Sequence, residues 1–146
     1  MSTTTQSIWT RHSILELIDV QDLAEAVDEQ WYNQTLCRVN DCVVRLGVMQ
    51  GTFHWHEHEY EDEYFYVIDG RFMIDLEARS VELTPQESFM VPRGVKHRTR
   101  APERTVILMV EGADVVPTGD DTDQFDGEQE TPEIADDGAG VKDKHW

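Results

Sequence analysis

Several kinds of residue and segment are scarce in this sequence, and each scarcity narrows the classes of protein to which it can belong. Only two cysteines occur among 146 residues, so the core has to form without a framework of disulfides. Basic residues number 12 against 30 acidic ones, and the formal charge of −18 argues against nucleic acid or anionic membranes as partners. The longest strongly apolar run, residues 106–110, is far shorter than a bilayer span. No signal peptide is recognisable at the start, so we expect one cytoplasmic domain.

The acidic charge is concentrated toward the end of the sequence. Residues 111–146 hold 12 acidic residues and two lysines, and the stretch beyond Gly112 is rich in Asp, Glu, Gly, Thr and Pro. This composition is typical of a disordered segment, whose simplest role is solubility. Nine of the 12 basic residues are arginine, a pattern that salt-adapted proteins show, but an acidic tail on a mesophilic protein explains the charge about as well.

One helical pattern precedes a long series of short apolar runs. Asp19 is the expected N-cap of a helix over about residues 20–30, whose apolar side carries Leu23, Ala24 and Val27. A short strand is expected before it, at residues 14–18. Runs of β-branched and aromatic residues then predict strands at 35–39, 42–50, 53–58, 63–68, 71–77, 80–83, 87–91, 97–100 and 104–110.

Many short strands with no helix between them indicate an all-β fold, an antiparallel sandwich or barrel. The expected organisation is an N-terminal arm with a short helix over residues 1–34, a β-barrel domain over 35–111 and an acidic tail over 112–146. Tight turns separate the strands, at Asn40-Asp41, Gly51, Asp69-Gly70, Thr84-Pro85 and Pro92-Arg93-Gly94. Asp69-Gly70 is the strongest hairpin signal among them.

The two cysteines flank the Asn40-Asp41 turn. If that pair turns a hairpin, Cys42 lies opposite Val39 and Cys37 opposite Val44, which puts the thiols roughly 7–8 Å apart on one face. That separation is long for a disulfide. We therefore expect two buried free thiols.

Histidines alternate with other residues in the stretch HWHEHEYEDE, residues 54–63. In an extended strand, His54, His56 and His58 point to one face, and Glu63 enters at the start of the next strand. Imidazoles spaced in this way can reach one ion together with a carboxylate. The alternative is a charged hairpin with histidines that face solvent.

Two motifs favour the metal site. The first is Gly51-x4-His56-x-His58-x4-Glu63-x6-Gly70 and the second is Pro92-x-Gly94-x2-His97. In this order, on a short all-β chain, they resemble the cupin superfamily over about residues 35–111, and the surrounding sequence looks like the small single-domain conserved-barrel cupins. The resemblance implies an antiparallel β-jelly-roll barrel, a homodimer paired through sheet edges, and one divalent metal bound by His56, His58, Glu63 and His97.

The sequence departs from the family pattern at two positions that are not ligands. Gln86 stands where the second motif usually opens with Gly, and Ala101 stands where it often closes with Asn. His54 lies outside the motif but shares the parity of the ligands. It is our candidate for proton transfer, with a satisfied structural histidine as the alternative.

Three imidazoles and a carboxylate accept Fe(II), Mn(II), Ni(II), Co(II), Cu(II) or Zn(II), and suit Mg(II) or Ca(II) poorly. The leading hypothesis is a metal-dependent enzyme of the oxygenase, isomerase or lyase type, acting on a small polar molecule that can be anionic. The rival interpretations are a non-catalytic barrel that binds or senses a metal or small ligand, and a barrel with a purely structural Zn(II).

Basic residues cluster around His97, at Arg93, Lys96, Arg98, Arg100 and Arg104. These cations either anchor an anionic substrate or pair with acids at the barrel rim, namely Glu57, Glu59, Glu61 and Asp62. We favour pairing, because Arg98 and Arg100 alternate with His97 and so face outward.

Overall fold

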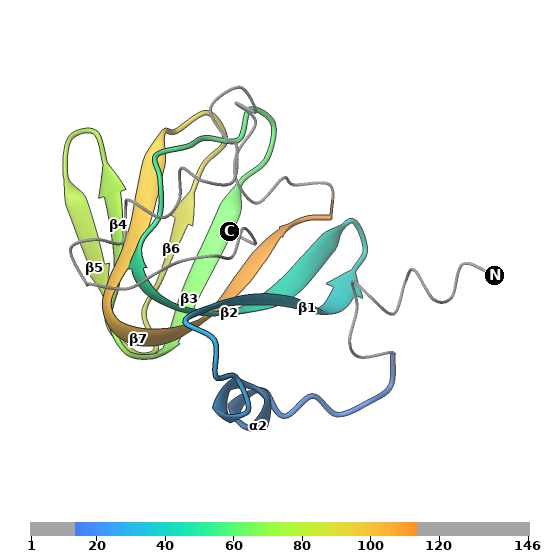
Figure 1. The fold of residues 1–146 in the computed structure, drawn as a ribbon. Coiled ribbons are helices and arrows are strands. Elements are labelled where there is room, and N and C mark those ends of the chain that lie inside the picture. Colours follow the sequence, from blue (N-terminus) through green and yellow to red (C-terminus); the bar gives the residue numbers. More distant parts are fainter. Residues whose placement is uncertain (1–13, 114–146) are drawn as a thin grey trace.

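The long strand β7 (His97–Gly112) organises the fold, because three other strands pair with it (Figure 1). The computed structural model describes residues 14–113. Within them, β7 pairs with β2 (Cys42–Thr52) along most of its length, with β3 (Glu63–Asp69) through its second half and with β4 (Phe72–Leu76) through its first four residues. Residues 97–100 and 104–110, expected as separate strands, are therefore parts of one bent strand.

The remaining strands complete an antiparallel barrel, which confirms the all-β prediction. One edge is formed by β1 (Trp31–Val39) and another by β6 (Ser88–Val91), in the order β1-β2-β7-β3-β6, while β5 (Ser80–Leu83) pairs with β4. The Asn40-Asp41 hairpin has the predicted register, with Val39 opposite Cys42 and Cys37 opposite Val44. Both thiols are free, as expected, but they are half-buried rather than buried.

The prediction of a hairpin at Asp69-Gly70 is wrong. Strands β3 and β4 do not pair with each other; they pair with different halves of β7. Gly70 lies in the turn that leads from β3 to β4, and its φ is +95°. A Cβ at this position would lie 2.5 Å from Thr105 Oγ1. Thr105 Oγ1 also accepts from Arg71 N–H and donates to the Arg71 carbonyl. Position 70 therefore requires glycine because the backbone packs closely against β7. The turn residues alone do not reveal that β7 is the neighbouring strand.

A six-residue helix, α2 (Val20–Glu25), covers the outer face of β1 and β2 (Figure 1). Asp19 caps it as predicted, because its Oδ1 accepts from Asp22 N–H at 3.0 Å. The helix is shorter than the expected 20–30, and no strand forms at residues 14–18. Ala24 and Val27 are buried against Leu36, Leu46, Val48 and Val106, as the apolar pattern indicates. No helix of the described part is long and apolar enough to cross a membrane.

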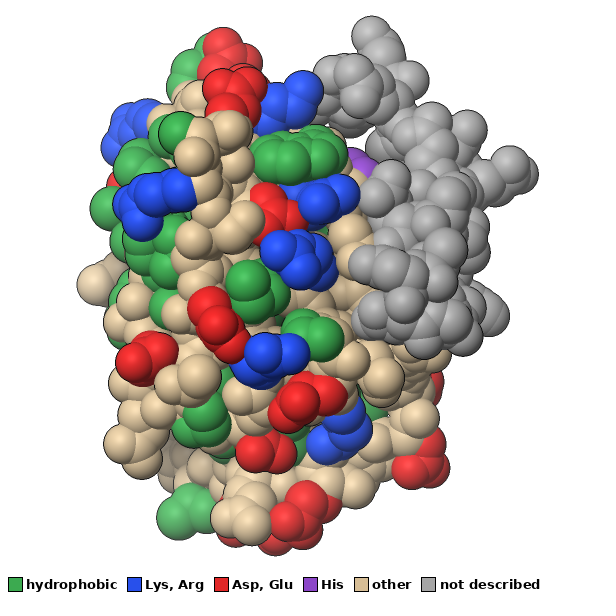
Figure 2. All heavy atoms as spheres, turned by 90° about the vertical axis from the view of Figure 1, so that its left-hand side faces the viewer, with side chains coloured by type: hydrophobic (Ala, Val, Ile, Leu, Met, Phe, Trp, Pro, Cys, Tyr) green, Lys and Arg blue, Asp and Glu red, His purple; other side chains and the backbone are tan. Residues whose placement is uncertain are grey.

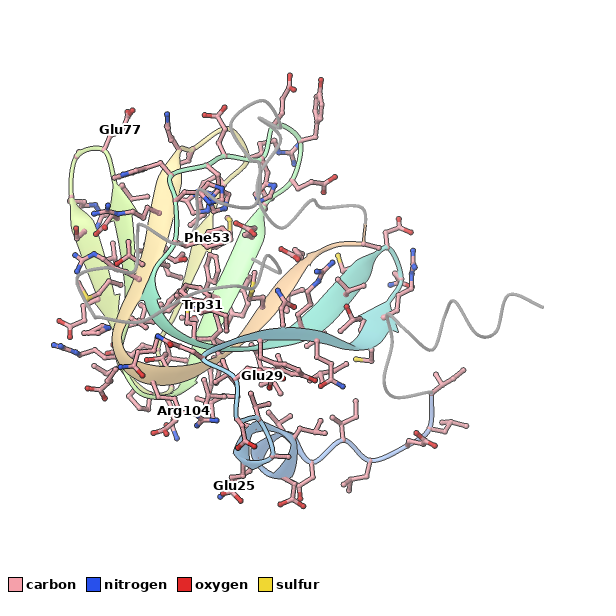
Figure 3. The ribbon with its side chains drawn as sticks, in the orientation of Figure 1. Glu25, Glu29, Trp31, Phe53, Glu77 and Arg104 are labelled. Atoms are coloured by element: carbon pink, nitrogen blue, oxygen red, sulfur yellow. The ribbon has the colours of Figure 1, made fainter. Side chains whose placement is uncertain are left out.

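The main core fills the inside of the barrel. Trp31 and Phe53 lie in the middle of the barrel (Figure 3), with ring centroids 5.8 Å apart. Inward-pointing residues alternate along the strands, so Phe65 and Val67 are buried while Tyr64 is exposed. This packed interior supports the polar site at one end of the barrel. The expected tail, residues 112–146, lies almost wholly outside the described residues.

Candidate metal site

His56 and His97 belong to segments far apart in the sequence, and two backbone hydrogen bonds join them. The His56 N–H donates to the His97 carbonyl and the His97 N–H donates to the His56 carbonyl, each at 2.9 Å. Residues 53–58 are not the regular strand that we expected, since the bridge at His56 is isolated. The paired backbones place the two rings side by side, with centroids 4.5 Å apart.

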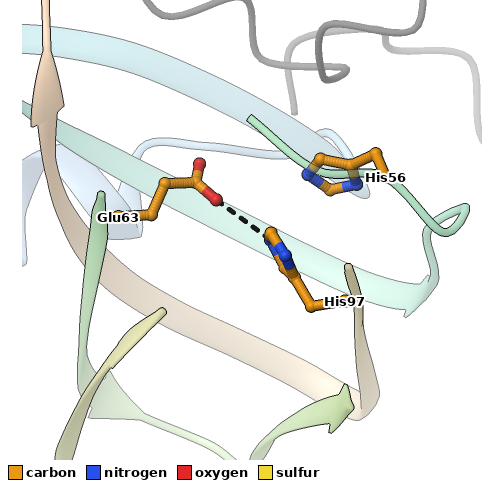
Figure 4. Close-up of side chains that lie close together, drawn as sticks. All are labelled: His56, Glu63 and His97. Carbon is orange, nitrogen blue, oxygen red and sulfur yellow. Dashed lines mark hydrogen bonds and ion pairs between the residues drawn. The ribbon is translucent and has the colours of Figure 1, made fainter. Parts of the chain in front are cut away.

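Glu63, at the start of β3, completes a buried group with these two histidines. One donor atom from each of His56, Glu63 and His97 lies within 4.8 Å of the others, and all three residues are buried. Figure 4 shows the side chains converging from three segments, with His97 Nε2 3.0 Å from Glu63 Oε1. Three of the four predicted ligands thus form one group.

Backbone carbonyls decide which nitrogen of each ring faces the group. His97 Nδ1 lies 2.9 Å from the Val95 carbonyl, and His56 Nδ1 lies 3.1 Å from the His54 carbonyl. Because a carbonyl oxygen only accepts, Nδ1 carries the hydrogen in both rings and Nε2 holds the lone pair. His97 Nε2 and the Glu63 carboxylate are then two acceptors 3.0 Å apart. A cation or a proton between them removes the repulsion.

The pKa shifts of His56 and Glu63 favour the protonation states that bind a metal. Burial, together with the neighbouring His97, lowers the pKa of His56 to about 3, so its imidazole is neutral at ordinary pH. Burial by itself raises the pKa of Glu63, but the close contacts with the His58 and His97 rings outweigh it and hold the pKa well below its ordinary value. Neutral imidazole and ionised carboxylate are the protonation states that bind a transition metal.

The donor set fits a divalent transition metal. Nitrogen donors and one carboxylate oxygen match Fe(II), Mn(II), Co(II), Ni(II), Cu(II) or Zn(II) better than Mg(II) or Ca(II). His58 is buried and its Nε2 lies 3.3 Å from Glu63 Oε2, but it is outside the three-residue group. Its role as a fourth ligand stays a prediction.

His54, our candidate for proton transfer, is half-buried beside the group. Its ring centroid lies 5.4 Å from that of His56 and 4.3 Å from that of Phe53. Its hydrogen bond to a predicted ligand is made by the backbone, because the His54 carbonyl accepts from His56 Nδ1. That contact orients a ligand whatever side chain stands at position 54.

The arginines near His97 mostly pair elsewhere than predicted. Arg98 and Arg100 both bind the buried Asp75, at 2.9 and 2.8 Å, an acid that is not among the four predicted partners. Arg93 does pair with a rim acid, Asp62, at 3.6 Å. Arg104 donates to the carbonyls of Ala24 and Val27, at 2.8 and 3.3 Å. On the face in Figure 2, basic side chains accordingly lie among acidic and apolar ones rather than in a patch of one sign.

Two charged residues inside the barrel were missed by the sequence analysis. Arg45 and Glu111 form an ion pair of 3.0 Å on the inner face of β2 and β7. Arg45 interrupts an apolar run and Glu111 ends one. Arg45 has the same strand parity as the buried Met49, and Glu111 the same parity as the buried Met109. A charged residue at an inward-facing position of an apolar strand could have indicated this pair in the sequence, because a buried charge needs a partner.

Comparisons with known proteins agree with this geometry. Residues 42–111 match the family model described as "Cupin domain". The uncharacterized protein YdbB of Bacillus subtilis (strain 168) is 40% identical over 90 residues, which are 61% of this chain and 80% of that protein.

Solved structures include a cupin-2 domain containing protein from Shewanella frigidimarina, with 29% identity and a TM-score of 0.64 over 66% of this chain and 94% of that one. KdgF from Halomonas sp. has the same fold, with a TM-score of 0.54, 22% identity and coverage of 61% and 85%.

Proposed function

Because this chain belongs to the cupin superfamily and carries a buried group of two imidazoles and a carboxylate, we propose that it is a metal-dependent enzyme acting on a small polar molecule. The observation that carries the proposal is the contact of His97 Nε2 with Glu63 Oε1, two acceptors that a cation brings together. One divalent transition metal is the proposed cofactor, with His56, Glu63, His97 and the predicted His58 as its ligands. When bound, it supplies Lewis acidity and, if it is a redox metal, electron transfer.

The chain's own residues would prepare that site in three ways. The Val95 and His54 carbonyls hold the His97 and His56 rings with Nε2 toward the group. The apolar side chains of Phe53, Phe65 and Met109 exclude water from the barrel interior. His54 is the side chain proposed to move a proton, and the reaction is of the oxygenase or the isomerase or lyase type.

Elemental analysis of protein purified without an affinity tag or chelator tests the metal. We expect near-stoichiometric Fe, Mn, Ni, Co, Cu or Zn, and its loss in His97→Ala. If neither the purified protein nor protein reconstituted with these ions retains metal, the proposal fails. Arg93→Ala is a matched control, because it removes an exposed pair with Asp62 and should leave the metal content unchanged.

Turnover separates the enzyme from its rival, a non-catalytic barrel that binds or senses a metal or small ligand. Oxygen uptake by the Fe(II)-loaded protein, or isomerisation of an added acid in anaerobic protein, supports the enzyme. Reversible ligand binding without either reaction supports the binding barrel. A Zn(II) that no added ligand reaches supports a structural site.

A homodimer in the cytoplasm is the proposed state of the protein. Size-exclusion chromatography with light scattering tests the dimer, and fractionation of cells tests the location. A small-molecule ligand is the proposed partner, and the acidic charge disfavours nucleic acid and anionic membranes.

A further inference from the structure

Three charged side chains lie side by side on three neighbouring strands inside the barrel. Glu111 of β7 is paired across the sheet with Glu63 of β3 and with Val43 of β2. Arg45, two residues along β2, reaches the same glutamate with Nε 3.0 Å from Oε2. Since cross-strand partners share a face, the order Arg45, Glu111, Glu63 leads from a cation directly to a predicted metal ligand.

This cation is almost wholly enclosed by the barrel. The Arg45 side chain is 14% exposed and that of Glu111 is 0% exposed. Arg45 lies opposite Met109, which in turn lies opposite Phe65, so its aliphatic part runs over the apolar core. Arg45 is therefore the member of the pair whose side chain still reaches solvent, and it lies on the same inner face as Glu63.

Stability alone gives a weak reason for the pair. Taking an arginine and a glutamate out of water costs about as much as their attraction returns, and apolar residues of similar volume often replace such pairs without loss. Glu111 is an especially unfavourable partner to bury, because its side chain is fully enclosed and lies opposite a second carboxylate, that of Glu63. A second use of the cation would account for the arrangement where stability does not.

The guanidinium of Arg45 has more N–H donors than its ion pair with Glu111 uses. It carries five N–H donors in a rigid fork, and the pair with Glu111 uses Nε. Within residues 14–113, Glu111 is the one ion-pair partner that the structure identifies for Arg45. The fork can thus hold Glu111 on one side and accept a second anionic group on the other.

The charges around the proposed metal also call for an anion. Among the enclosed groups, a divalent cation contributes +2 and Arg45 +1, while Glu63 and Glu111 contribute at most −2 between them, and a neutral His56 contributes nothing. Glu61, half-buried near Glu111, brings a further −1 at the rim. The enclosed groups therefore keep a positive charge when the metal is bound, and an anionic ligand that replaces Glu61 as its counter-charge is neutralised inside the barrel.

We propose that Arg45, oriented by Glu111, binds the carboxylate of a small acid whose second oxygen group meets the metal. This inference rests on the proposed function and deepens it by naming the substrate class. The other arginines near His97 are engaged with Asp75, Asp62 or the carbonyls of Ala24 and Val27. Arg45 is the cation that the described part of the chain directs into the barrel.

The test uses malonate as a probe of full-length protein reconstituted with Co(II), whose visible absorption reports both metal uptake and ligand binding. Arg45→Met removes the charge at similar volume, and Arg45→Lys keeps the charge without the fork. The double variant Arg45→Met/Glu111→Gln removes both charges, so that no unpaired carboxylate is left to unfold the barrel.

We expect all three variants to take up Co(II), and malonate to bind the Met and double variants about 10- to 100-fold more weakly than the wild type. The malonate affinity of Arg45→Lys should lie between that of Arg45→Met and that of the wild type. Wild-type affinity for malonate in the Co(II)-loaded double variant overturns the inference and leaves the proposed function standing, as does a wild type that takes up Co(II) and ignores malonate. Failure of the wild type to bind Co(II) overturns both.

Discussion

His56 and His97 form an antiparallel bridge of two backbone hydrogen bonds, and this bridge rather than a continuous strand brings the two metal motifs together. The side chains of a directly opposed pair point to the same face, so the two rings stand with centroids 4.5 Å apart. The metal group therefore depends on the backbone of residues 53–58 staying against the first residues of β7.

Substitutions in the histidine run should separate side-chain ligands from backbone support. His56→Ala should lose bound metal because it removes a donor atom, whereas His54→Ala should retain it because the His54 carbonyl that orients His56 remains. Metal content by mass spectrometry of the purified variants measures the difference. An empty site in His54→Ala alone would show that the ligand assignment is wrong.

Gly70 is expected to tolerate no side chain. Gly70→Ala requires a φ of +95° and places Cβ 2.5 Å from Thr105 Oγ1 and 2.6 Å from the Arg104 carbonyl, so we expect a loss of about 2–4 kcal/mol of unfolding free energy. Gly94→Ala is the matched control: its φ is +76° but nothing lies within 4 Å, and about 1 kcal/mol is expected. Urea unfolding of both variants tests this, and equal losses would contradict the steric argument.

Gln86 has a left-handed backbone conformation, which glycine adopts without strain, at the position where the family pattern usually has glycine. Its φ is +74°, and its N–H donates to the Val67 carbonyl at 2.8 Å, which maintains the turn despite the backbone strain. Gln86→Gly should therefore stabilise the protein by about 0.5–1 kcal/mol, while Gln86→Ala should change little. Thermal and urea unfolding measure the gain, and a destabilised glycine variant would show that the Gln86 side chain contributes more than its backbone strain.

Asp75 should make stability fall at acid pH. Burial by itself raises the pKa of Asp75, but hydrogen bonds from Arg100, Ser80 and Arg98 lower it by more than burial raises it. The net effect is a pKa of about 2 instead of 3.8. Because the folded pKa lies below the unfolded one, the contribution is complete above about pH 4 and is lost as the pH falls toward 2. Asp75→Asn should lose about 1–3 kcal/mol at pH 7, and its deficit should shrink between pH 4 and pH 2.

Urea unfolding of wild type and Asp75→Asn at pH 7, 4 and 3 measures that deficit. Ser80→Ala is the control, since it removes one hydrogen bond to Asp75 but leaves both arginine pairs. A deficit that does not change with pH would argue that the aspartate acts by shape rather than by charge.

Arg104 should hold helix α2 against the barrel. It donates to the Ala24 and Val27 carbonyls at the end of the helix, where a positive charge is also favourable. Arg104→Met should lower the unfolding free energy by about 1–2 kcal/mol and increase hydrogen exchange over residues 20–27, and Arg104→Lys should restore part of the protection. Unchanged exchange in Arg104→Met would show that apolar packing of Ala24 and Val27 suffices.

The sequence by itself determined the fold class, most strand positions, the Asn40-Asp41 register, the Asp19 cap and the residues of the candidate metal group. The fold class, the register and the cap follow from local chemistry, namely alternation along strands and turn residues, whereas the choice of ligands came from the resemblance of the two motifs to those of cupins. His54 was selected by the same alternation, but residues 53–58 form no regular strand, so parity could not decide its orientation.

Only the tertiary structure decided which strands meet. Asp69-Gly70 looked like a hairpin because the sequence does not reveal that β3 and β4 both pair with β7. The partner of Arg98 and Arg100 is Asp75, more than 20 residues away, and the partner of Arg45 is Glu111. Pairing between distant strands depends on how the whole chain closes into a barrel, and residue spacing carries no record of that closure.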